Sequence, residues 1–239
     1  SVTLQDGAIL SAAEVFLIAT QQIEVASGAE IDTIGKGAPP FDSTGGYVYE
    51  PTSTSMLVVS NGILDIGGNI AGQASITIDP GAKIYSQGTI GFATAANVTV
   101  DPTASLGTAY LDLSVSTLNL GDPGVMAGAA VPAGMLLSQA RLDQLLKGDI
   151  STGAPALQGL ILGASQSLNI FGTVDLSVVN PATGKADLAL TLNTPAIYGY
   201  GTAADVATLN VGSLYWNGVS EQSAGQVAYV SAPPPAVAI

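Results

Sequence analysis

The sequence predicts an all-β chain that folds as a right-handed parallel β-helix with one short helical insertion. One nine-residue phrase, with the pattern apolar-x-apolar-x-x-Gly/Thr-Ala-x-apolar, occurs at Val2–Leu10, Ile23–Ile31, Ile76–Ile84 and Val98–Leu106. The first two copies start 21 residues apart and the last two start 22 apart. A fixed period of this size is the signature of a solenoid.

The composition excludes several classes of partner. Apolar residues make up 47% of the chain and charged residues only 10%, well below the ~25% that is usual in soluble domains. Five Lys and Arg face 18 Asp and Glu, which gives a net charge of −13. Nucleic acids and anionic lipids need cationic groups for binding, so we expect neither as a partner. The longest nearly apolar run, Val125–Leu137, has 13 residues, whereas insertion across a membrane needs about 20.

The repeated phrases predict strands with one face in the core, because alternate side chains of a strand point to opposite faces. The residues expected to point inward are Val2, Leu4, Ile23, Val25, Ile76, Ile78, Val98 and Val100. Those expected to point outward are Thr3, Glu24, Thr77 and Thr99. The apolar run Val15–Ala19 predicts a buried strand, with a helix over residues 12–22 as the alternative.

The period breaks over residues 35–55, where seven glycines and prolines predict a loop excursion. Ile23 and Ile76 are 53 residues apart, which predicts two coils plus this loop. The loop carries three aromatic candidates for partner binding, Phe41, Tyr47 and Tyr49. Packing of these rings against the core is the alternative.

Strands are next expected at Met56–Ser60 and Ile63–Ile66. The Asn61-Gly62 dipeptide between them is a strong hairpin signal, although a solenoid corner can also use it for positive φ. Further strands are expected at Tyr110–Leu113 and Thr117–Leu120.

A helical insertion is expected over residues 126–149. Ser138 is a good N-cap, Lys147 suits the negative C-terminal end, and Gly148 suits the left-handed position that follows a helix. The apolar face of this helix consists of Leu142, Leu145 and Leu146. A helix of about nine residues is too short to persist alone, so we expect it to lie against the sheets or to cap one end of a coil.

The period returns after residue 155, with strands expected at Leu168–Ile170, Leu188–Leu190 and Leu209–Val211. We therefore expect one β-helix domain over residues 1–232. Residues 233–239 predict a proline-rich tail or linker, because proline has no N–H to donate to a ladder. Since the chain begins inside a repeat, it is expected to be a piece of a longer protein.

The sequence offers no motif for catalysis, cofactor binding or metal binding. It has no histidine or cysteine, and its one arginine, Arg141, lies on the expected helix. Ser-His-Asp catalysis, histidine-ligated zinc and arginine phosphate clamps are thereby excluded. Asp65, Asp79 and Asp101 follow strands and could supply the paired carboxylates of a glycoside hydrolase, but aspartate is also a favoured corner residue.

A second aromatic group lies near the end of the chain. Its members are Tyr198, Tyr200, Tyr215 and Trp216. Together they could form a patch that stacks on sugars or binds a partner. The alternative is that these rings pack at the edge of a coil.

Four phrases resemble the repeat-rich exoproteins of the filamentous haemagglutinin family. They are Ile31–Gly37 (IDTIGKG), Phe41–Tyr49 (FDSTGGYVY), Leu142–Leu157 (LDQLLKGDISTGAPAL) and Thr194–Gly201 (TPAIYGYG). The resemblance covers essentially the whole chain and implies a right-handed parallel β-helix exported by two-partner secretion. It also implies an outer-membrane transporter that acts on a part of the protein outside this chain, and roles in adhesion, biofilm formation or contact-dependent toxin display.

From the residues and the resemblance together, we expect a structural and adhesive rod segment of a large bacterial exoprotein, without enzymatic activity or cofactor. The expected location is secreted or on the bacterial outer surface. The expected partner is a host or bacterial cell-surface protein or glycan. Two alternatives remain open, a carbohydrate-active β-helix enzyme and a non-catalytic glycan-binding module.

Overall fold

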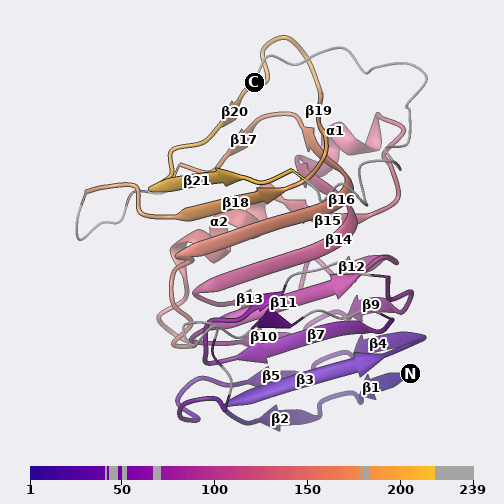
Figure 1. Ribbon diagram of the computed structural model, residues 1–239, viewed down its shortest axis with the longest axis vertical. Helices are drawn as coiled ribbons and strands as arrows, with labels where there is room; N and C mark the ends of the chain where they lie inside the picture. Colours follow the sequence, from indigo (N-terminus) through magenta and orange to yellow (C-terminus); the bar gives the residue numbers. More distant parts are fainter. Residues whose placement is uncertain are drawn as a thin grey trace.

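The computed structural model describes residues 1–40, 42, 48–49, 53–66, 71–177, 179 and 184–218. The chain is mostly β, with 48% strand and 7% helix, in sheets that are parallel and mixed. Its strands stack along the long axis of the molecule, from β1 at the N-terminal end to β21 near the other end (Figure 1). No helix of the described residues is both long and apolar enough to cross a membrane.

Two four-stranded sheets repeat one order of strands. The first contains β1 (Val2–Leu4), β4 (Gln22–Val25), β9 (Ser75–Ile78) and β12 (Val98–Val100), in that order. The second contains β2 (Ile9–Ser11), β5 (Glu30–Asp32), β10 (Lys83–Tyr85) and β13 (Ser105–Gly107). Every neighbouring pair in both sheets is parallel.

A nine-stranded sheet lies beside them. Its main path is β3 (Glu14–Ala19), β7 (Ser55–Ser60), β11 (Thr89–Thr94), β14 (Tyr110–Gly121), β16 (Gly159–Phe171), β18 (Ala189–Asn193) and β21 (Ser213–Trp216). Off this path, β15 (Met135–Ser138) pairs with β14 and β19 (Ile197–Tyr200) pairs with β16. Two short pairs complete the fold, β17 (Val174–Asp175) with β20 (Ala207–Thr208) and β6 (Val48–Tyr49) with β8 (Asp65–Ile66).

The repeated phrases align in register, as their period predicts. Val2 pairs with Ile23, Ile23 with Ile76, and Ile76 with Val98. The residues expected to point inward belong to one core cluster or pack against it. In the same strands, Thr3 and Thr99 are exposed, while Glu24 and Thr77 are half-buried. The predicted facing is therefore confirmed, because apolar residues at every second position turn to the shared core.

The all-parallel arrangement predicted by the sequence is wrong at β7, which runs antiparallel to both β3 and β11. The chain leaves β5, makes the excursion and enters the large sheet from the opposite end. The expectation of two coils between Ile23 and Ile76 is also wrong, because these residues pair directly. One coil with a long insertion fills the interval.

The hairpin predicted at Asn61-Gly62 is wrong as well, since β7 pairs with β3 and β11 while β8 pairs with β6. Neither residue has a positive φ. Asn61 instead fastens a loop of the second sheet. Its side chain accepts a hydrogen bond from Thr33 Oγ1 at 2.7 Å and donates to Gly37 O at 3.0 Å.

The chain after β7 forms a strap, residues 61–66, over the outer face of the large sheet. Leu64 and Ile66 pack there with Met56, Val58 and Ala93 in a second apolar cluster. β7 is therefore buried on both faces, with Leu57 and Val59 on the side of the main core. A strand covered on both faces carries a continuous apolar run, which explains the sequence Met56–Val59.

The predicted helix is confirmed as α2 (Gln139–Lys147). Ser138 Oγ accepts a hydrogen bond from Arg141 N at 3.3 Å, and Gly148 follows with φ of 67°. The three leucines of its apolar face are buried. A second helix, α1 (Pro123–Ala127), was not predicted, and Asp122 caps it by accepting from Gly124 N at 2.6 Å.

Later strands differ from prediction in their extent. The two strands expected over residues 110–120 form one strand, β14, with an irregularity between Val115 and Thr117. The strand expected at Leu209–Val211 is wrong, because that segment lies between β20 and β21. Both differences arise because pairing partners, rather than local alternation, set where a ladder begins and ends.

Candidate functional site

The helix α2 stands where the second sheet stops. That sheet ends at β13, and α2 contacts β13 on one side and exchanges hydrogen bonds with β17 on the other. Gln139 Nε2 donates to Asp175 O at 2.9 Å, and Asp175 N donates to Gln139 Oε1 at 3.0 Å. The side-chain amide of Gln139 thus offers β17 the donor and acceptor that a strand would offer.

On the opposite side of α2, Arg141 takes over the ladder of the turn before β13. In the earlier coils, Ala29 O accepts from Lys83 N and Ala82 O accepts from Ser105 N, both at 2.8 Å. At the equivalent position, Ala104 O accepts from Arg141 Nη1. The fork of the guanidinium, with its fixed donors, can satisfy several carbonyls that a further coil would otherwise cover.

Arg141 Nη2 reaches two more carbonyls of the same turn, Asp101 O at 2.9 Å and Pro102 O at 3.3 Å. The side chain is only 8% exposed. Burial lowers the pKa of its guanidinium, while the carboxylate of Asp101 opposes that shift. Because an arginine still keeps its charge, this buried cation must be held by its hydrogen bonds.

The replacement of a strand by a helix leaves empty space on either side. An α-helix with its side chains is about 10–12 Å across, whereas neighbouring strands are about 4.8 Å apart. Three cavities border α2, with volumes of about 620, 320 and 190 Å³. We take the largest, which we call the α2 groove, as the candidate site.

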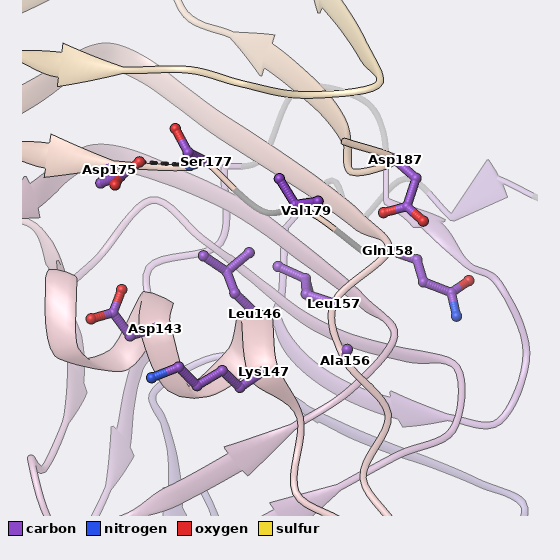
Figure 2. A pocket seen from close by; sticks show the side chains of 10 residues that line it. All are labelled: Asp143, Leu146, Lys147, Ala156, Leu157, Gln158, Asp175, Ser177, Val179 and Asp187. Atoms are coloured by element: carbon purple, nitrogen blue, oxygen red, sulfur yellow. Dashed lines mark hydrogen bonds between the residues drawn. The ribbon is translucent and has the colours of Figure 1, made fainter. Parts of the chain in front are cut away.

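The α2 groove has an apolar floor and a polar rim. Leu146, Leu157 and Val179 lie in its middle, while Asp143 and Asp175 lie at one side and Asp187 at the other (Figure 2). Its remaining lining residues are Lys147, Ala156, Gln158 and Ser177.

Backbone hydrogen bonds hold the wall that faces α2. Leu157 N donates to Leu145 O at 2.9 Å, which fixes residues 156–158 beside the C-terminal turn of the helix. Gln158 N donates to Ala109 O at 2.7 Å and so ties the same segment to the start of β14. The groove is therefore formed by parts of the chain that each have their own backbone partners.

Two of the three carboxylates have neutral partners. Asp143 Oδ1 accepts from Gln139 Nε2 at 2.8 Å, and Asp175 Oδ1 accepts from Ser177 N at 2.7 Å. Among the residues that the structure describes, neither carboxylate forms an ion pair. Each keeps a second oxygen directed at no described donor, and that oxygen can accept a hydrogen bond from a ligand.

The sequence did not point to this site. Asp143, Asp175 and Asp187 come from α2, β17 and the segment before β18, with no shared motif. The carboxylates considered from the sequence lie elsewhere. Asp79 and Asp101 sit at neighbouring corners between the first and second sheets, whereas Asp65 is on β8.

Asp101 follows the turn chemistry that was offered as the alternative to catalysis. Its Oδ1 accepts from Thr103 N at 2.8 Å and from Thr103 Oγ1 at 2.6 Å. Both hydrogen bonds lower the pKa of its carboxyl. A carboxylate already engaged by its own turn is poorly placed for work on a substrate.

The sequence also gave no warning of Asp112, which is 1% exposed on β14 under the strap. Burial raises the pKa of its carboxyl to about 7, although a hydrogen bond from Ile66 N opposes the shift. The nearby Asp65 adds to the rise. The one available signal was a carboxylate in the middle of the apolar run of β14.

The aromatic candidates do not gather in one place. Phe41 and Tyr47 lie outside the described residues, and the side chain of Tyr49 does as well. Tyr200 stacks on Phe171 with ring centroids 4.5 Å apart, so it packs on a buried ring as the alternative proposed.

The other three aromatic candidates separate between two strands. Tyr198 is half-buried on β19, beside one end of β16. Tyr215 and Trp216 are 62% and 59% exposed on β21, which pairs with β18. As successive residues of a strand they point to opposite faces, and Trp216 Nε1 donates to Thr194 O at 3.1 Å. The structure therefore gives no single patch of four rings.

Comparison with known protein families, with curated proteins and with solved structures finds no match for this chain.

Proposed function

We propose that the chain is a segment of a right-handed parallel β-helical rod with a structural and adhesive role and no catalytic activity. The observation that carries this proposal is the register of the two four-stranded sheets, in which each coil lies directly over the previous one. Backbone hydrogen bonds between coils make such a stack stiff, and its length grows with the number of repeats.

A stiff stack suits a protein that acts through its reach and its lateral surfaces. Its outward threonines give it a polar face of low charge, and no cysteine is needed to hold the coils together. These properties fit a secreted or surface-displayed bacterial exoprotein, similar to filamentous haemagglutinin, that is exported through an outer-membrane transporter. The partner would be a cell-surface protein or glycan.

The rod can be tested by adding coils. Residues 76–97 make up one period, since Ile76 pairs with Val98. Three further copies of this segment should lengthen the molecule by about 14 Å, at about 4.8 Å per coil. Small-angle X-ray scattering measures the longest dimension, and unfolding of the lengthened chain or an unchanged dimension would contradict the proposal.

Adhesion can be tested separately from shape. The purified protein, immobilised on beads, should retain epithelial or bacterial cells in a manner that soluble protein blocks. Deletion of residues 41–49, the aromatic part of the excursion, should reduce retention while the circular dichroism spectrum stays the same. Retention no greater than on beads coated with an unrelated acidic protein would contradict the adhesive role.

A carbohydrate-active enzyme is a second candidate because one observation favours it. The α2 groove contains Asp143, Asp175 and Asp187, and hydrolysis of a glycosidic bond needs two carboxylates about 5–9.5 Å apart. A panel of polysaccharides assayed for reducing ends decides the matter. Activity that disappears in Asp175→Asn and in Asp143→Asn would replace the non-catalytic proposal.

A further inference from the structure

The α2 groove combines an excess of negative charge with an apolar floor. Three aspartates and one lysine line it, which leaves a formal excess of two negative charges. Val179 is 50% exposed above the floor, so apolar surface is open between the carboxylates (Figure 2). An exposed apolar surface with a charged rim is typical of a binding site rather than of an idle surface.

The negative charge of the groove is not balanced by the described part of the chain. The ion pair found there, Lys83 with Glu30 at 3.6 Å, lies on the second sheet and away from the groove. Asp143 and Asp175 form no such pair, and neither does Lys147. A cationic ligand would therefore meet carboxylates whose present partners are neutral.

The arrangement suits several separate cations better than a single ion. The carboxylates come from three segments and lie at both sides of the groove (Figure 2). Among the described residues, no three acidic side chains are grouped closely enough to surround one metal ion. A ligand that contacts all of them must be extended and must carry more than one positive group.

We propose that the α2 groove binds an extended basic segment of a partner protein. Lysine or arginine heads of that segment pair with Asp143, Asp175 and Asp187, and their aliphatic stems lie over Leu146, Leu157 and Val179. Long cationic side chains combine these two properties, because their stems cover apolar surface while their heads stay at the rim. The net charge of −13 attracts such a segment from a distance. This inference names the kind of partner for the adhesive role proposed above and rests on that role.

The test uses three probes and the whole chain. The first probe is a short acetylated and amidated peptide in which lysine alternates with leucine. The second replaces each lysine with glutamate, and the third is a chitosan oligomer, which offers amines on a sugar. Isothermal titration calorimetry at low salt gives the dissociation constant of each probe, and a repeat at high salt gives its ionic dependence.

Two double variants remove the same charge at different places. Asp143→Asn with Asp175→Asn alters the groove, whereas Asp6→Asn with Glu24→Gln alters the first coil, on the N-terminal side of the molecule. We expect the lysine peptide to bind about five- to tenfold more weakly to the groove variant and with unchanged affinity to the first-coil variant. Val179→Ser should also weaken the lysine peptide, because it removes apolar surface without changing charge.

Several outcomes would overturn the inference. Equal weakening in both double variants means attraction by net charge alone, and no binding of the lysine peptide means that the groove has no such partner. Binding of the chitosan oligomer without the peptide assigns the groove to a glycan. These failures leave the rod intact if the added coils lengthen it, whereas a compact particle that still binds the peptide would remove the rod and keep the groove.

Discussion

The regular coils and the segments attached to them satisfy their backbones in different ways. Between coils, main-chain donors meet main-chain acceptors, as Lys83 N meets Ala29 O. The strap and α2 have no such ladder to the coils beneath them. Side chains fasten them instead, with Arg141 and Gln139 for α2 and Asp112 for the strap.

The difference indicates where the fold depends on single residues. A ladder of backbone hydrogen bonds survives most substitutions, because every residue except proline supplies the same groups. A fastening made by a side chain is lost with that side chain, and it leaves buried carbonyls or amides without partners. We therefore expect large effects at the fastenings and small effects at surface positions on the ladders.

The largest effect is expected at Asp112, whose carboxyl accepts from Ile66 N at 2.9 Å. Its pKa is about 7 in the folded protein, against an ordinary value of 3.8. Between these values the unfolded chain has already lost the proton that the folded protein keeps. The free energy of unfolding should therefore fall as pH rises from about 4 to about 7, by up to about 4 kcal/mol.

Urea unfolding across this pH range, followed by circular dichroism, measures the fall. Asp112→Asn should remove most of it, because the amide stays neutral and can still accept from Ile66 N. Other groups also titrate, since burial raises the pKa of Glu14 while hydrogen bonds lower that of Asp101. The decisive quantity is thus the difference between variant and parent, and parallel pH profiles would refute this account of the strap.

A somewhat smaller effect is expected at Arg141. Arg141→Met keeps most of the volume but leaves Ala104 O, Asp101 O and Pro102 O without the donors that they have now. We expect a loss of about 3 kcal/mol in the free energy of unfolding. Arg141→Lys should recover only part of it, since an ammonium lacks the planar fork. Equal stability of the lysine variant and the parent would show that charge, rather than the fork, fastens α2.

A loss of about 1 kcal/mol is expected for Gln139→Ala, which removes the two hydrogen bonds to Asp175. Gln139→Glu keeps the acceptor for Asp175 N and suits the first turn of a helix, so it should lose less. Hydrogen exchange at the amide of Asp175 reports on this contact directly. Unchanged protection in both variants would mean that β17 does not depend on α2.

The smallest effect is expected on a ladder. Lys83 N is bonded to Ala29 O, while the side chain of Lys83, half-exposed, pairs with Glu30 at 3.6 Å. Lys83→Met keeps the backbone bond and removes the surface ion pair, so stability should change by less than about 0.5 kcal/mol. The same urea titration measures it, and a loss comparable with that of Arg141→Met would remove the distinction between ladders and fastenings.

The sequence predicted the parts of the fold that local patterns encode. The period and the facing of Ile23, Ile76 and Val98 follow from alternation that each segment carries by itself. The limits of α2 follow from Ser138 and Gly148, which act within one turn of the helix ends. Such signals need no knowledge of which segment lies beside which.

The direction of β7 could not be read in the same way. An alternation of apolar and polar residues is unchanged when the strand is reversed, so it carries no information about the direction in which the strand runs. That direction depends on where the excursion returns to the large sheet. The error over Ile23 and Ile76 has the same origin, because a spacing in sequence does not tell an added coil from an insertion.

By itself, then, the sequence determined the period of the coils, the residues that face the core and the helix that interrupts them. The tertiary structure alone decided the reversal of β7, the strap over Asp112 and the place of α2 between β13 and β17. It also decided the α2 groove, whose carboxylates at 143, 175 and 187 meet only because a helix occupies the width of more than one strand. Local patterns act within a few residues, whereas these features depend on contacts between segments that are tens of residues apart.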